Sequence, residues 1–174
     1  MRKIFILTLS LCFISFGLVN ANGKDEHPPL EKGFFEIGYK TVEKALDECE
    51  NHFNKNIELP YKMPPIEFTH YFGRCSKDFG INNNFEIEYL NENLSENHYQ
   101  VTVRPREHRI KFKQRNIARK IKMDKGSALL LNNPNGVNIL VFERDDWQYM
   151  LSVDKRVSER VPVEVLVDIA NSFK

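Results

Sequence analysis

Hydrophobic and polar positions follow two different periods along this chain. From Thr41 to Phe53 the apolar residues recur at helical spacing and share one face, while charged residues occupy the others. Thr41 itself is a suitable N-cap residue. Near the end of the chain, Pro162 fits the first turn of a second helix, whose apolar stripe consists of Val163, Leu166, Val167, Ala170 and Phe173. The pattern therefore predicts a helix before and a helix after the central part of the chain.

Between these helices the period falls to two, which is typical of strands with one buried face. The alternating segments are residues 66–72, 85–89, 99–103, 109–113, 128–131, 137–142 and 147–153. Pro134-Asn135-Gly136 predicts a hairpin turn, and Asp145-Asp146 predicts another. The expected fold is α+β: a single antiparallel sheet of about six or seven strands, with an N-terminal and a C-terminal helix packed on it.

The N-terminal segment has the layout of a secretory signal peptide. Arg2 and Lys3 precede an apolar run, Ile4–Val19, and small residues suit cleavage after about Ala21. The run is shorter than the roughly 20 residues that span a bilayer, although an uncleaved N-terminal anchor is the alternative. We therefore expect a signal peptide at 1–21, a flexible lead-in at 22–39 and one domain at 40–174, secreted or extracytoplasmic, with no further membrane span.

Export changes how the three cysteines are interpreted. Cys12 is lost with the leader, which leaves Cys49 and Cys75 in an oxidising compartment. A disulfide between them would stabilise the domain by about 3 kcal/mol. The alternative is two buried thiols that pack as small hydrophobic groups.

Two segments near the end of the chain resemble a known family. In Leu140–Leu151 a strand, a short turn and a strand carrying Tyr149 follow one another, and the helix at Leu166–Phe173 contains Ile169-Ala170-Asn171-Ser172. Together with the proline-containing stretch Ile57–Pro64, they resemble the extracytoplasmic domain of unknown function numbered 4367. The resemblance implies an α+β domain outside a Gram-positive membrane, sometimes carried by anti-sigma factors or lipoproteins. A direct anti-sigma role is not expected, because the chain shows no sigma-binding part and no lipobox.

The sequence contains no catalytic or cofactor signature. It has no His pair at zincin spacing, no CxxC, no phosphate loop and no dinucleotide fingerprint, so we expect no metal and no cofactor. The leading hypothesis is a non-enzymatic module that binds or senses something at the cell envelope. The alternatives are a thiol-dependent hydrolase that uses Cys75 and His70, and a carrier of an apolar ligand held between sheet and helices.

One segment differs from the rest by its charge. The formal net charge of the chain is only +1, yet Lys and Arg strongly outnumber acids between Arg104 and Lys125. We call the following residues the basic belt: Arg109, Lys111, Lys113, Arg115, Arg119, Lys120 and Lys122. Clustered cations attract polyanions, and at an envelope these are anionic polymers or lipid head groups rather than nucleic acid. The alternative is a solvated strand face whose cations pair with Glu86 and Glu88 across the sheet.

Overall fold

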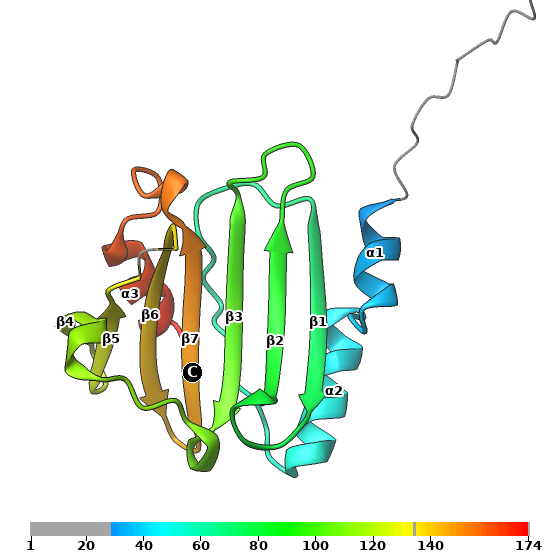
Figure 1. Ribbon diagram of the computed structural model, residues 1–174, viewed down its shortest axis with the longest axis horizontal. Helices are drawn as coiled ribbons and strands as arrows, with labels where there is room; N and C mark the ends of the chain where they lie inside the picture. Colours follow the sequence, from blue (N-terminus) through cyan, green and yellow to red (C-terminus); the bar gives the residue numbers. More distant parts are fainter. Residues whose placement is uncertain (1–28, 134, 174) are drawn as a thin grey trace, which may run out of the picture.

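The computed structural model of the protein describes residues 29–133 and 135–173. Seven strands form one antiparallel sheet in the order β1-β2-β3-β7-β6-β5-β4 (Figure 1). The strands are β1 (His70–Lys77), β2 (Asn83–Leu90), β3 (His98–Pro105), β4 (Ile117–Lys122), β5 (Ser127–Leu131), β6 (Val137–Arg144) and β7 (Trp147–Asp154). The helices are α1 (Leu30–Glu36), α2 (Val42–Phe53) and α3 (Val163–Asn171). The predicted α+β class, single sheet and terminal helices are confirmed.

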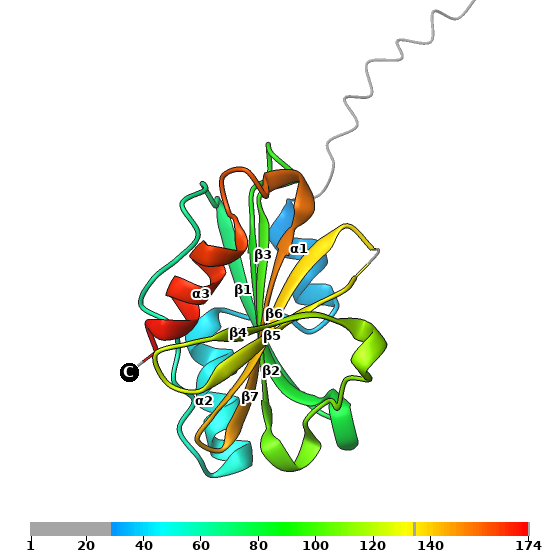
Figure 2. The same cartoon turned by 90° about the vertical axis from the view of Figure 1, so that its left-hand side faces the viewer.

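The sheet consists of two meanders, β1-β2-β3 and β4-β5-β6-β7, which meet where β3 pairs with β7. Helices α2 and α3 both lie against one face, which we call the covered face (Figure 2). Helix α1 and the connection 106–116 lie on the other, which we call the open face. The fold is therefore a sheet with a helical layer on one side and two separate flanking segments on the other.

The covered face carries the apolar half of each central strand. Ile87, Val101 and Leu151 are paired across β2, β3 and β7, and all three are fully buried. Helix α2 approaches β1 closely at Gly73, where an added Cβ would lie 2.8 Å from the Cβ of Ala45. Glycine at this position permits the close approach because any larger side chain would push the helix away.

A disulfide joins the same helix and strand. The Sγ atoms of Cys49 on α2 and Cys75 on β1 are 2.11 Å apart, and the Cα atoms are 5.4 Å apart. Of the two alternatives that the sequence left open, the structure therefore has the bridge rather than two separate thiols. The covalent link fixes the first helix to the first strand.

The structure corrects the predicted strand at residues 109–113. This segment is extended but pairs with no strand among the described residues, and it lies on the open face between two 3-10 turns, Arg106–His108 and Gln114–Asn116. Its alternation arises because Ile110 and Phe112 are half-buried against the sheet while their neighbours are exposed. The strand that follows is β4, which the sequence analysis did not predict. Strand β1 also begins later than expected, at His70 rather than Ile66.

The lead-in was also predicted incorrectly in part. Residues 22–39 were expected to be flexible, but Leu30–Glu36 forms α1, whose Phe34 ring stacks on Phe72 of β1 at a centroid distance of 4.5 Å. The segment was missed because it is only seven residues long and has Gly33 in its middle. The expected signal peptide, residues 1–21, lies outside the described residues.

Candidate functional site

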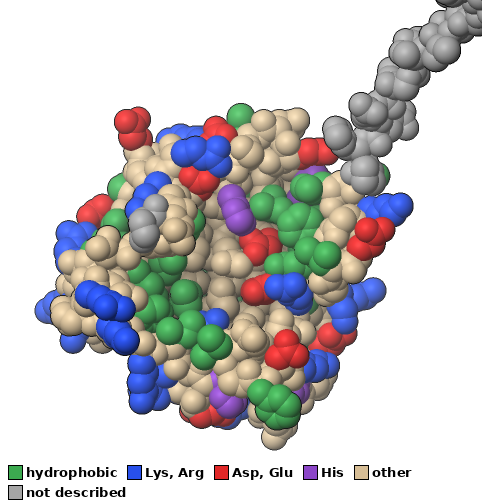
Figure 3. Space-filling view, in the orientation of Figure 1, with side chains coloured by type: hydrophobic (Ala, Val, Ile, Leu, Met, Phe, Trp, Pro, Cys, Tyr) green, Lys and Arg blue, Asp and Glu red, His purple; other side chains and the backbone are tan. Residues whose placement is uncertain are grey.

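The open face of the sheet has an apolar half and a charged half. One row of side chains crosses all seven strands in register: Lys120, Leu129, Val141, Met150, Thr102, Glu86 and Arg74. Its middle members on β5, β6 and β7 are apolar, whereas those on β1 and β2 are charged. The space-filling view shows this face hollowed in its middle, with apolar patches on either side (Figure 3). A face of this kind suits a ligand that has both apolar and charged groups.

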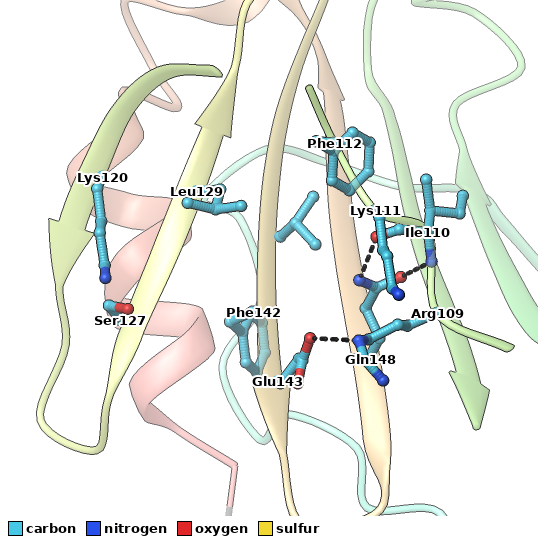
Figure 4. A pocket seen from close by; sticks show the side chains of 11 residues that line it. Arg109, Ile110, Lys111, Phe112, Lys120, Ser127, Leu129, Phe142, Glu143 and Gln148 are labelled. Carbon is cyan, nitrogen blue, oxygen red and sulfur yellow. Dashed lines mark hydrogen bonds and ion pairs between the residues drawn. The ribbon is translucent and has the colours of Figure 1, made fainter. Parts of the chain in front are cut away.

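A pocket of about 500 Å³ lies on the apolar half, between the segment 109–113, which contacts β6 and β7, and the side chains of β5 and β6. We call it the 109–113 pocket. Leu129 and Val141 line it on the sheet side, and Phe112 lines it from the segment. Figure 4 shows Lys120 at one side of this pocket and Lys111 and Arg109 at the other, with Leu129 between them. The pocket thus combines an apolar wall with cations from two separate parts of the chain.

A single buried side chain holds the segment over the pocket. The Gln148 side-chain oxygen accepts a hydrogen bond from the Ile110 amide at 2.9 Å, and its nitrogen donates to the Ile110 carbonyl oxygen at 3.0 Å. These two bonds satisfy both backbone groups of Ile110, as a neighbouring strand would. Gln148 is 3% exposed and is itself satisfied by this arrangement. The segment is therefore fixed to the face of the sheet rather than to its edge.

The cations of the pocket differ in their partners. Arg109 pairs with Glu143 through its Nε atom at 3.6 Å, and Arg106 pairs with the same carboxylate at 2.9 Å. Within the described part of the chain, Lys111 and Lys120 have no carboxylate within 4.0 Å. Both lysines therefore remain free to pair with an anionic ligand.

The rest of the basic belt does not join the pocket. Lys113 and Arg115 are exposed and do not line it. Arg119 and Lys122 lie on the edge strand β4, where they line a second groove of about 450 Å³ against α3, and Arg119 lies 3.8 Å from Glu164. The structure therefore divides the belt: Arg109, Lys111 and Lys120 line the 109–113 pocket, whereas Arg119 and Lys122 line the groove, which Lys120 also reaches.

Glu86 and Glu88 do not neutralise the belt, contrary to the alternative drawn from the sequence. Glu86 accepts a hydrogen bond from the Tyr39 hydroxyl at 2.7 Å and pairs with Arg74, whose guanidinium also lies over the Tyr39 ring. Glu88 accepts hydrogen bonds from Gln100 and from His98, both at 2.6 Å. Burial, followed by the hydrogen bond to Glu86, raises the pKa of Tyr39 far above its usual range. The acids of β2 thus belong to a separate polar network. We call it the polar network, and it consists of Tyr39, Arg74, Glu86, Glu88, His98 and Gln100.

This network on the charged half was not identified from the sequence. Tyr39 lies in the segment that was expected to be flexible, and Arg74 occurs singly on a strand. The one available signal was the pair of carboxylates at Glu86 and Glu88, two residues apart and hence on one side of β2. Two adjacent carboxylates on a sheet need cationic or donor partners when they are buried, but the sequence does not show which residues supply them.

The pair proposed for a thiol enzyme is separated by the sheet. His70 points to the open face, where its ring lies 3.0 Å from Glu31, whereas Cys75 points to the covered face. The Cys75 sulfur is also bonded to Cys49. A thiolate nucleophile next to an imidazole base is therefore not formed by these two residues in this structure.

Residues 29–133 and 135–173 contain no group of three or more His, Cys, Asp or Glu side chains placed to hold a metal ion. Within the same ranges, no helix is both long and apolar enough to span a bilayer. No family model, curated protein or solved structure matches the chain. The resemblance to the extracytoplasmic family therefore stays a prediction.

Proposed function

We propose that this protein is a non-enzymatic binding module of the cell envelope that holds the anionic group of an amphipathic ligand in the 109–113 pocket. The observation that carries the proposal is the placement of Lys111 and Lys120, two lysines without carboxylate partners in the described chain, beside the apolar surface of Leu129 and Val141. An anionic head group would pair with the lysines while its apolar part packs on the strands.

The location outside the cytosol is part of the same proposal. It is supported by the signal-peptide layout of residues 1–21 and by the disulfide between Cys49 and Cys75, since such bonds persist in oxidising compartments. The resemblance to a Gram-positive extracytoplasmic domain agrees with it. In such an envelope the abundant anions are lipid head groups and phosphate-containing polymers.

The test is binding of the full chain to phosphatidylglycerol vesicles at low salt, with phosphatidylcholine vesicles as the uncharged reference and lipoteichoic acid as the polymer. The double variant Lys111→Glu/Lys120→Glu should bind the anionic probe at least about tenfold more weakly, because each lysine near an anionic surface contributes about 1 kcal/mol. Lys113→Glu/Arg115→Glu is the matched control: it changes the net charge equally but lies outside the pocket.

The control decides whether the pocket or the overall charge is responsible. If the pocket binds the anion, the control variant should lose only a small part of the affinity. Equal losses in the two double variants would contradict a specific pocket and would leave only diffuse attraction by the basic belt. An absence of salt-sensitive binding by the unmodified protein to either anionic probe would overturn the proposal as a whole.

A further inference from the structure

The charged half of the open face contains an arginine that forms no ion pair with the described carboxylates. Arg104 of β3 is paired in register with Gln148 of β7 and points to the open face. It is 6% exposed, and no described carboxylate lies within 4.0 Å of it. Its Nη1 atom contacts the Met150 sulfur at 2.9 Å, which is a weak acceptor for a guanidinium. A buried cation without a carboxylate partner is costly to the fold unless something else satisfies it.

Two other buried polar atoms near Arg104 also lack a hydrogen-bond partner. Among the described residues, the buried side-chain atoms without one are Arg74 Nε, Asn84 Oδ1, Arg104 Nε and Tyr99 OH. The first three belong to side chains on the open face, and Asn84 lies on β2, next to β3. Only Tyr99 belongs to the covered face. The unsatisfied atoms therefore gather on the charged half, around Glu86.

The unsatisfied atoms of Arg104 and Asn84 indicate which chemical groups a ligand of this region would carry. The guanidinium of Arg104 can donate two parallel hydrogen bonds to a planar carboxylate. The Asn84 oxygen can accept a hydrogen bond from a hydroxyl or amine on the same ligand. Glu86 and Glu88 lie on the same face, and their partners are already supplied by Arg74 and His98. The negative charge of these acids repels a doubly charged phosphate more strongly than a singly charged carboxylate, so the site favours the carboxylate.

From this arrangement we infer that the charged half of the open face is a second binding site, which takes a small carboxylate carrying a neighbouring hydrogen-bond donor, with Arg104 as its anchor. The hollow in the middle of this face provides the entrance (Figure 3). The site does not rest on the proposed function, because Lys111 and Lys120 take no part in it.

The test is NMR titration of the intact chain with lactate, which has a carboxylate and a hydroxyl. Acetate, 1,2-propanediol and inorganic phosphate serve as partial mimics. Lactate at millimolar concentration should shift the Arg104 Nε–H resonance and the Thr102 and Met150 amides, which neighbour Arg104 on the open face. Acetate should bind more weakly, and the diol should not bind. No shift with lactate, or tighter binding of phosphate than of lactate, would overturn the inference.

A pair of arginine variants completes the test. Arg104→Met removes the charge and keeps most of the side-chain volume, so lactate affinity should fall about thirtyfold or more. Arg115→Met, at an exposed arginine, should bind lactate as the unmodified protein does. Unchanged binding in Arg104→Met would overturn the anchor role. If that variant does not fold, the Arg104 resonance of the unmodified protein still decides. Lys111→Glu/Lys120→Glu should keep lactate binding, which separates this site from the 109–113 pocket.

Discussion

The same three strands present opposite chemistry on the two faces of the sheet. On the covered face β2, β3 and β7 place Ile87, Val101 and Leu151 side by side, all without exposure to solvent. On the open face the next row consists of Glu88, Gln100 and Ser152. The covered face is packed by two helices, whereas the open face is only flanked by α1 and the segment 106–116 (Figure 2). The difference shows that the apolar core and the accessible polar groups lie on opposite faces of one sheet.

The largest expected effect is on the covered face. Phe85→Ala removes a fully buried ring from the layer between β2 and α2, and we expect it to lower the free energy of unfolding by about 3–5 kcal/mol. Urea denaturation monitored by circular dichroism measures the change. Ile139→Ala is the counterpart on the open face, where the side chain is only half-buried, and it should cost less than half as much. Equal costs would contradict the division of roles between the faces.

The second prediction concerns the disulfide, which links α2 to β1 on the covered face. The bridge closes a loop with a sequence separation of 26 residues, so removing it should lower the free energy of unfolding by about 3.5 kcal/mol in the chain-entropy account. The measurement compares urea midpoints of the oxidised protein, the reduced protein and the variant Cys49→Ala/Cys75→Ala. The reduced protein and the variant should agree closely. Two free thiols in the native protein, detected by mass spectrometry, would show that the bridge does not form.

The covered face was also the part that the sequence predicted best. Strands β2, β3 and β7 alternate cleanly because one side of each enters the core and the other does not. Helix α2 was predicted for the same reason, from its one apolar stripe and from Thr41, whose side chain accepts the Lys44 amide hydrogen bond at 3.5 Å. An element with one face buried in a continuous core has apolar residues at regular spacing, which the sequence shows directly.

The edge strand β4 and the segment on the open face could not be predicted from hydrophobic periodicity in the same way. Strand β4 was missed because a bulge between Ile117 and Arg119 breaks its period of two, and because none of its side chains is fully buried. The segment 109–113 was predicted as a strand because it alternates, although its backbone is held by one glutamine side chain. The belt residues were visible by charge alone. Which of them line a pocket depends on how the connection 106–116 crosses the sheet, and local spacing carries no information on that path.

A smaller loss of stability is expected when the segment 109–113 is released from the open face. Gln148→Leu keeps an apolar body but loses both hydrogen bonds to Ile110, which should cost about 1–2 kcal/mol. Hydrogen exchange of the Ile110 amide and limited proteolysis within residues 109–113 should both accelerate, because the segment is released from the sheet. Gln100→Leu is the control, since its side chain bonds to Glu88 rather than to backbone. Unchanged protection of Ile110 would show that Gln148 is not what holds the segment.

The smallest effect is a pH dependence confined to the open face. The hydrogen bond from His98 to Glu88 raises the pKa of this histidine, aided by the charge of Asp154, although desolvation opposes the shift. Because the folded-state pKa lies above the unfolded value of about 6.5, the stabilisation is fully present below that pH. It is lost as the pH rises through the folded-state pKa.

His98→Gln should therefore lower the free energy of unfolding more at pH 5 than at pH 9, by less than about 1 kcal/mol, since the side chain is 45% exposed. An identical pH profile for His98→Gln and the unmodified protein would show that the hydrogen bond between His98 and Glu88 does not contribute to stability.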